Sequence, residues 1–168
     1  MITLKISGDL IEQMLKDLRR PHPLAAERVG FLFFRQSGLR GGALLIAQQY
    51  RSIRDDQYLE DDSVGARFDG SAIREAMQCA LSEGSSAFHV HLHEHRGVPR
   101  FSGVDKREMQ QIMPCFVNLC PERLHGAFVL SADAVAARVW GAGLLPQGQS
   151  PDKITVVGRH MRFWVNHD

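Results

Sequence analysis

Residues 88–105 read FHVHLHEHRGVPRFSGVD, and the first part of this stretch alternates between apolar residues and histidine. Strand side chains point to opposite faces in turn, so Phe88, Val90 and Leu92 are predicted to enter a core. The other face then carries half of the chain's eight histidines, namely His89, His91, His93 and His95. Further along, Ser102 and Asp105 have the spacing of a capping box, which predicts a helix that begins near Ser102.

Histidines two positions apart on one strand can bind a single metal ion. Their side chains leave the same face about 6.5–7 Å apart, and each ring adds reach to a Zn–N bond of about 2.0–2.1 Å. Asp105, at the helix start, is a suitable third ligand, and water takes the fourth position that a catalytic zinc keeps open. Such a site also needs a base for the water. Glu27, directly before an apolar segment, is the candidate.

The rest of the chain predicts a single domain over residues 1–168, with helices and a mixed sheet. Helical spacing of apolar residues predicts helices over 10–18 and 71–83, and Pro114 is expected to stop or kink the third helix. Glycines around 38–42 predict a hairpin, and residues 51–69 a surface loop or irregular strand. The class is α/β (α+β), a sandwich in which a mixed sheet is flanked by helices. Strands are predicted over Ile2–Ile6, Val29–Phe34, Ala43–Tyr50, Ala87–His93, Gly126–Ser131, Val135–Trp140, Ile154–Val157 and Met161–Val165.

Composition excludes several classes of partner. A formal net charge of +1 with interspersed signs argues against nucleic-acid binding, which needs a clustered basic face. No apolar run approaches the roughly 20 residues of a membrane span, and the N-terminal residues lack a signal-peptide pattern. The three cysteines, Cys79, Cys115 and Cys120, form no C-x-x-C pair and are expected to be reduced thiols. We therefore expect a cytoplasmic protein.

Taken together, these elements resemble the JAB/MPN (Mov34) domain with the JAMM zinc-metalloprotease signature. Glu27 precedes Gly30-Phe31-Leu32, and a histidine strand and Ser102-x-x-Asp105 follow in the family's order. The order of strands and helices is similar over roughly residues 1–140. The HLHEH loop is closest to bacterial members that are encoded beside ubiquitin-like activating and conjugating enzymes. The resemblance thus implies an MPN/JAB-like sandwich.

The resemblance also implies a function and a role for each residue. Two histidines and Asp105 would hold zinc (Zn2+), Glu27 would activate the bound water and protonate the leaving amine, and Ser102 would donate a hydrogen bond to the oxyanion. The activity implied is that of an isopeptidase or peptidase that cleaves at the C-terminus of a ubiquitin-like protein, in precursor maturation or deconjugation. The expected partners are that C-terminal tail or its conjugates, and activating or conjugating enzymes of the same system.

The histidine register has two solutions. Asp105 follows His93 by 12 positions and His91 by 14, and the family's interval is slightly shorter than either. The smaller interval favours His91 and His93 as ligands, although neither is followed by the family's common proline. Phe88 before His89 resembles the family's aromatic–histidine junction, so a pair of His89 and His91 is the alternative.

Other readings of the same residues lead to different functions. A histidine strand can be plain surface, Ser102 and Asp105 can be only a helix cap, and Glu27 can simply begin a strand. A cupin also carries His-x-His, but its fold is nearly all β. The metallo-β-lactamase pattern HxHxDH is absent. A third possibility is a non-catalytic MPN-type scaffold, which usually lacks some of the chemical residues.

Overall fold

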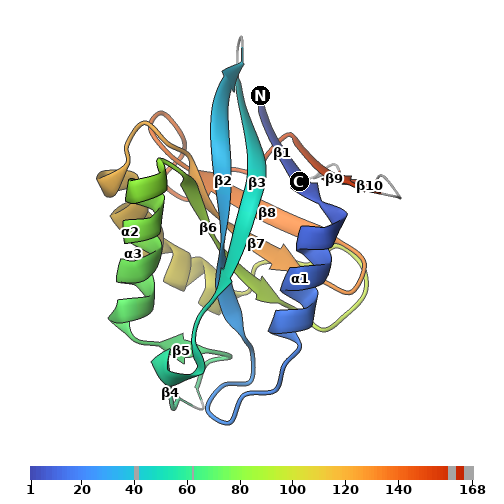
Figure 1. The fold of residues 1–168 in the computed structure, drawn as a ribbon, viewed down its shortest axis with the longest axis vertical. Helices are drawn as coiled ribbons and strands as arrows, with labels where there is room; N and C mark the ends of the chain where they lie inside the picture. Colours follow the sequence, from blue (N-terminus) through green and yellow to red (C-terminus); the bar gives the residue numbers. More distant parts are fainter. Residues whose placement is uncertain (40–41, 62, 159–161, 165–168) are drawn as a thin grey trace.

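The computed structural model describes residues 1–39, 42–61, 63–158 and 162–164. Its centre is a curled, mixed eight-stranded sheet in the order β10-β9-β1-β3-β2-β6-β7-β8, flanked by three helices (Figure 1). The helices are α1 (Gly8–Leu18), α2 (Gly70–Glu83) and α3 (Gly103–Leu119). The strands are β1 (Ile2–Ser7), β2 (Val29–Leu39), β3 (Gly42–Ser52), β6 (Ser86–Leu92), β7 (His125–Leu130), β8 (Val135–Trp140), β9 (Lys153–Val157) and β10 (Arg162–Trp164). The predicted mixed α/β class and the predicted order of these elements are confirmed.

Strand β6 carries the histidines and lies in the middle of the sheet. It pairs antiparallel with β2 and parallel with β7, and Val29 lies opposite His91. Because β2 starts where β6 ends, the chain that enters β2 passes beside the last histidines of β6. This pairing brings Glu27 close to His91, although the two residues lie far apart in the sequence.

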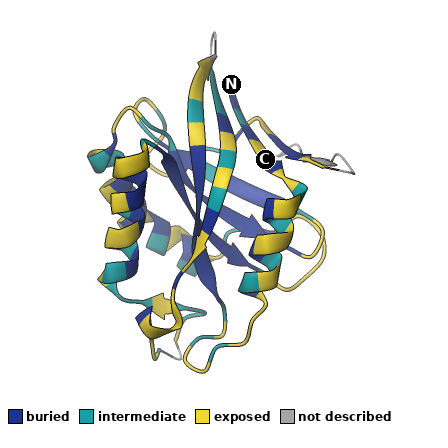
Figure 2. Cartoon of the chain, viewed as in Figure 1, coloured by how far each residue is buried: buried dark blue, intermediate teal, exposed yellow. Residues whose placement is uncertain are grey.

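The two faces of the sheet are covered by different helices. Phe88, Val90 and Leu92 belong to the core beneath α1, as the alternation predicts. The opposite face packs against α2 and α3 through a second apolar cluster that includes Phe31 and Phe116. Every residue of β6 is consequently buried, and Figure 2 shows this strand in dark blue. The histidine face of β6 therefore lies beneath helices.

Local signals fix the helix ends. Asp69 caps α2 by accepting a hydrogen bond from a backbone amide of its first turn, and Gly84 ends the helix with a left-handed φ of 57°. Of the two outcomes predicted for Pro114, a stop or a kink, the stop does not occur, because α3 continues to Leu119. Burial of the α3 face that includes Met113 and Phe116 offsets the cost of a proline inside a helix, about 3 kcal/mol.

The segment 51–69 is more ordered than a surface loop. It holds the end of β3, a short 3-10 turn, η1 (Asp55–Gln57), and a two-stranded ribbon of β4 (Tyr58–Leu59) and β5 (Arg67–Phe68). Some predicted positions lie outside the described residues: Gly41 of the predicted hairpin turn, and Met161 and Val165, the ends of the last predicted strand. Among the helices that the structure describes, none is long and apolar enough to cross a membrane.

Candidate metal centre

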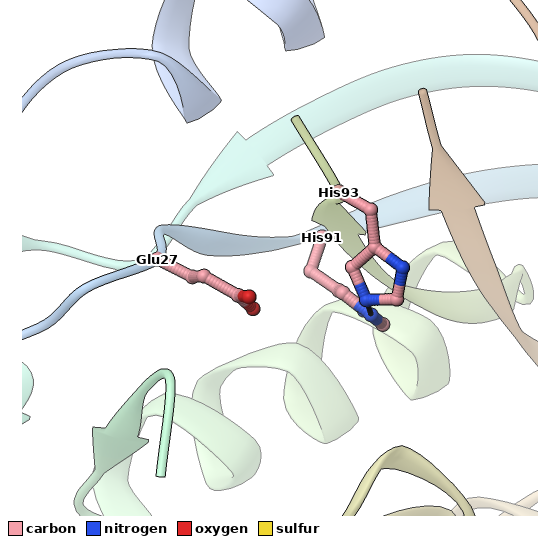
Figure 3. A group of neighbouring side chains, drawn as sticks. All are labelled: Glu27, His91 and His93. Carbon is pink, nitrogen blue, oxygen red and sulfur yellow. Dashed lines mark hydrogen bonds between the residues drawn. The ribbon is translucent and has the colours of Figure 1, made fainter. Parts of the chain in front are cut away.

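His91 and His93 bring their ring nitrogens together at the end of β6. The two Nε2 atoms lie 3.2 Å apart. His91 is buried in the strand, whereas His93 follows it and is held by a 2.9 Å hydrogen bond from its amide to the Leu130 carbonyl. Figure 3 shows the two rings converging on one region. The strand end therefore supplies two imidazole nitrogens at one point.

Asp105 completes this group from the first turn of α3. Its Oδ1 is 3.3 Å from His91 Nε2, and its Oδ2 is 3.6 Å from His93 Nε2. Oδ2 also accepts a 2.6 Å hydrogen bond from the Ser102 amide, so the predicted capping box is present. Burial opposes ionisation, but the hydrogen bonds with His91 and Ser102 outweigh it and hold the pKa of Asp105 well below its usual range. The carboxylate is therefore charged at neutral pH.

The distances in this group match those of a tetrahedral zinc site. Two ligand atoms that each lie about 2.0–2.1 Å from a tetrahedral zinc are about 3.3 Å apart. The measured separations between His91, His93 and Asp105 are 3.2, 3.3 and 3.6 Å. Two imidazoles and one carboxylate are also an ordinary donor set for zinc. The three residues therefore fit a zinc ion with one coordination position left open.

Glu27 lies on the open side of the same group. One carboxylate oxygen of Glu27 and the ring nitrogens of His91 and His93 all lie within 4.8 Å of one another. In Figure 3 the carboxylate points toward the two rings. The Glu27 amide donates a 2.8 Å hydrogen bond to the Gly65 carbonyl, and a Cβ at Gly65 would lie 2.8 Å from Glu27 Cδ. A side chain at position 65 would therefore displace the Glu27 carboxylate from this place.

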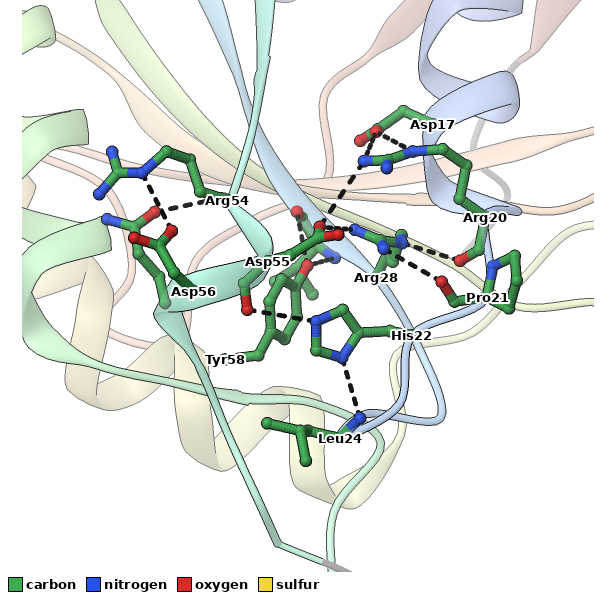
Figure 4. A network of polar contacts seen from close by, with 12 residues as sticks. Asp17, Arg20, Pro21, His22, Leu24, Arg28, Arg54, Asp55, Asp56 and Tyr58 are labelled. Atoms are coloured by element: carbon green, nitrogen blue, oxygen red, sulfur yellow. Dashed lines mark hydrogen bonds and ion pairs between the residues drawn. The ribbon is translucent and has the colours of Figure 1, made fainter.

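The neighbour of Glu27 is held by a polar network (Figure 4). The buried Arg28 guanidinium donates hydrogen bonds of 2.8 and 3.1 Å to the carbonyls of Arg20 and Pro21, and one of 2.7 Å to Asp55. The Tyr58 hydroxyl accepts a 2.9 Å hydrogen bond from the amide of Val29, the residue that follows Arg28. Because Arg28 directly follows Glu27, these bonds fix the backbone from which the Glu27 side chain extends.

His89 lies apart from this convergence. Its ring stacks on Phe68 at 6.0 Å and contacts Phe31 edge-on at 5.8 Å, and neither ring nitrogen has a hydrogen-bond partner among the described residues. Burial, and next the nearby His91, lower the pKa of His89 to about 3, so the ring is neutral at pH 7. His95 lies on the exposed loop with its Nδ1 2.9 Å from the Arg96 carbonyl oxygen. The geometry therefore favours the His91/His93 register.

These groups line one pocket of about 230 Å³, called here the metal pocket. Its lining includes every predicted site residue, Glu27, His91, His93, Ser102 and Asp105, together with Gly65, Ala66, His89 and Glu108. The Ser102 hydroxyl accepts a hydrogen bond from the Asp105 amide, and no acceptor for its own proton occurs among the described residues. It is therefore free to donate into the pocket.

The sequence reasoning missed one pocket residue, Glu108. It lies three positions after Asp105 on α3, so the two side chains share a face of the helix. That spacing was the available signal.

Comparison with known proteins adds no relative. The sequence matches no family model, and no curated protein matches it. The fold is mixed α/β, and its three helices rule out the nearly all-β architecture of a cupin. The JAB/MPN resemblance therefore rests on the sequence motifs alone.

Proposed function

We propose that this protein is a JAMM-type zinc isopeptidase or peptidase with an MPN/JAB-like fold. The observation that carries the proposal is the grouping of His91, His93 and Asp105 at separations suited to one zinc ion, with the Glu27 carboxylate opposite. In this proposal the two histidines and Asp105 hold the zinc. When bound, zinc polarises a carbonyl and makes a water molecule acidic enough to be deprotonated near neutral pH.

In this proposal, Glu27 transfers protons and Ser102 stabilises the negative charge that develops during the reaction. Glu27 removes a proton from the attacking water and returns it to the amine that leaves, as a general base and then a general acid. The Ser102 hydroxyl donates a hydrogen bond to the carbonyl oxygen as negative charge develops there. A donor of this kind contributes about 2.7–4 kcal/mol of transition-state stabilisation. The Arg28 network supports this chemistry by fixing the backbone beside Glu27.

The substrate in this proposal is the C-terminal tail of a ubiquitin-like protein, in a precursor or a conjugate. The β4–β5 ribbon supports an extended substrate, because the residues just before β5, Gly65 and Ala66, line the metal pocket. Among the described strands, β4 and β5 pair only with each other, and in this proposal the peptide adds beside one of them as a further strand. Activating and conjugating enzymes of the same system are the proposed protein partners.

The test is cleavage by the zinc-loaded protein of ubiquitin-like proteins that carry a C-terminal extension or an isopeptide-linked lysine. Mass spectrometry identifies the cleaved bond, and Glu27→Gln is the matched inactive variant. We expect one zinc per chain and cleavage by the unaltered protein only. A protein that binds zinc but cleaves none of these substrates refutes the isopeptidase proposal. A folded protein that binds no zinc favours the non-catalytic scaffold.

A further inference from the structure

A second hollow adjoins the metal pocket. It encloses about 340 Å³ between the β4–β5 ribbon and helices α2 and α3, and it shares Ala66 and Glu108 with the metal pocket. An extended chain lying across the metal pocket can therefore place a neighbouring side chain in this hollow. Part of its lining is apolar, contributed by Phe68, Ile73 and Ile112.

Glu108 stands at the junction of the two hollows without a cationic partner. Among the described residues, no ion pair or side-chain hydrogen bond involves its half-buried carboxylate, and it lies outside the group of metal-ligating atoms around Glu27. Burial, followed by the negative charge of Asp105, raises the pKa of Glu108. An ionised carboxylate that is partly desolvated and unpaired is unfavourable, and a hydrogen-bonded cation removes this cost.

Among the described residues, the other charged groups that line the second hollow are paired with each other. Arg67 lies 2.9 Å from Asp61, whose carboxylate also accepts a hydrogen bond from Ser63. Arg67, the one cationic residue among the described residues of the lining, is therefore paired with Asp61 of the same lining, and Glu108 is left to an incoming group. Apolar walls beside an unpaired carboxylate match the two parts of a lysine or arginine side chain, an aliphatic stem and a charged end.

We propose that the second hollow is a specificity subsite for a lysine or arginine side chain of the substrate. Glu108 pairs with the charged end, and Phe68, Ile73 and Ile112 contact the stem. The inference rests on the proposed function and refines it, because it selects tails with a basic residue near the scissile bond. Glu108 acts on binding and does not touch the reacting atoms.

The test uses sets of fluorogenic tail peptides that differ at one position near the scissile bond, where arginine, lysine, glutamine or glutamate is placed. We expect the protein to cleave the arginine or lysine peptide about 10- to 100-fold better, in kcat/KM, than the glutamine peptide at one position. Glu108→Gln should bring this ratio close to one, and Glu108→Lys should favour glutamate. Glu12→Gln on α1, far from the pocket, is the matched control and should keep the ratio.

A binding measurement separates failure of the inference from failure of the proposed function. Fluorescence anisotropy with the zinc-free protein compares the arginine and glutamine peptides without any cleavage. The subsite is supported if the unaltered protein prefers the arginine peptide and Glu108→Gln loses this preference, even if no peptide is cleaved. Equal binding or no binding of the two peptides, or a preference that persists in Glu108→Gln, overturns it. Zinc-dependent cleavage without any basic preference leaves the proposed function standing and removes only the subsite.

Discussion

The two histidine registers make opposite predictions for one pair of substitutions, His89→Leu and His93→Leu. Both remove an imidazole from the same short segment and leave an apolar side chain. The His93 ring lies 3.2 Å from His91 and 3.6 Å from Asp105, whereas the His89 ring has no polar partner among the described residues. We therefore expect only His93→Leu to impair zinc binding.

The expected magnitudes follow from these contacts. Zinc binding at a structural four-ligand site is worth about 10–16 kcal/mol, or about 2.5–4 kcal/mol per ligand, so His93→Leu should weaken zinc affinity by about 70- to 900-fold. His89→Leu leaves the proposed ligands in place and removes two buried nitrogens without hydrogen bonds. An unsatisfied buried polar group costs about 1–3 kcal/mol, so this substitution should raise the free energy of unfolding by a similar amount.

Two assays measure these effects separately. Competition with a chromophoric chelator gives the zinc affinity, and urea unfolding in the presence of excess chelator gives the stability of the zinc-free protein. The reasoning is refuted if His89→Leu loses zinc while His93→Leu retains it, because the ligands would then be His89 and His91. Loss of zinc in both variants with normal folding would mean that both rings contribute.

Three further predictions concern the neighbourhood of Glu27 and the buried histidine of β7. Gly65→Ala places a methyl group 2.8 Å from Glu27 Cδ and should lower kcat about 100-fold with zinc affinity unchanged. The control is Gly38→Ala, whose methyl group meets no atom within 4 Å and should leave kcat unchanged. Equal kcat values in the two variants would contradict this prediction. Arg28→Leu removes three hydrogen bonds and should lower the free energy of unfolding by about 2–4 kcal/mol in urea titrations, and a loss below about 1 kcal/mol would show that the network is dispensable. His125 is fully buried, and burial lowers its pKa to about 4, so the unfolded chain binds the proton more strongly and stability falls with pH below about 6.5. Between pH 7 and 5 this residue should account for about 2 kcal/mol of the stability lost by the zinc-free protein, and a His125→Gln variant with an unchanged pH slope would refute the assignment.

Features encoded within a few residues were predictable from the sequence. The alternation in β6 places Phe88 and Val90 in one core because strand geometry determines the face of each side chain. Asp69 and Gly84 mark the ends of α2 because capping and a left-handed backbone depend on local chemistry. The same local logic identified the capping box that begins with Ser102.

Features that depend on contacts distant in sequence could not be predicted in this way. The opposition of Val29 and His91 is set by strand register, and only this pairing explains why Glu27 lies near the histidines. The spacing of Glu108 from Asp105 predicts that they share a helix face. That Glu108 has no ion-pair partner among the described residues can be seen only once the β4–β5 ribbon and the helices are packed together. Pro114 does not end α3, because tertiary burial of this helix outweighs the local penalty of a proline.

The alternative between a helix cap and a metal ligand at Asp105 was not a true alternative. The two carboxylate oxygens have different principal partners: Oδ2 accepts the Ser102 amide, and Oδ1 lies nearest to His91. A carboxylate that is hydrogen-bonded to the first turn of a helix has already lost rotational freedom. Binding a metal ion then costs less conformational entropy of this side chain. The cap therefore orients a carboxylate that is a zinc ligand in the proposed function, and the same sequence pattern suits both roles. The capping box alone therefore could not distinguish a helix cap from a metal ligand. The short distances from the Asp105 carboxylate to His91 and His93 are the observation that favours a ligand role as well.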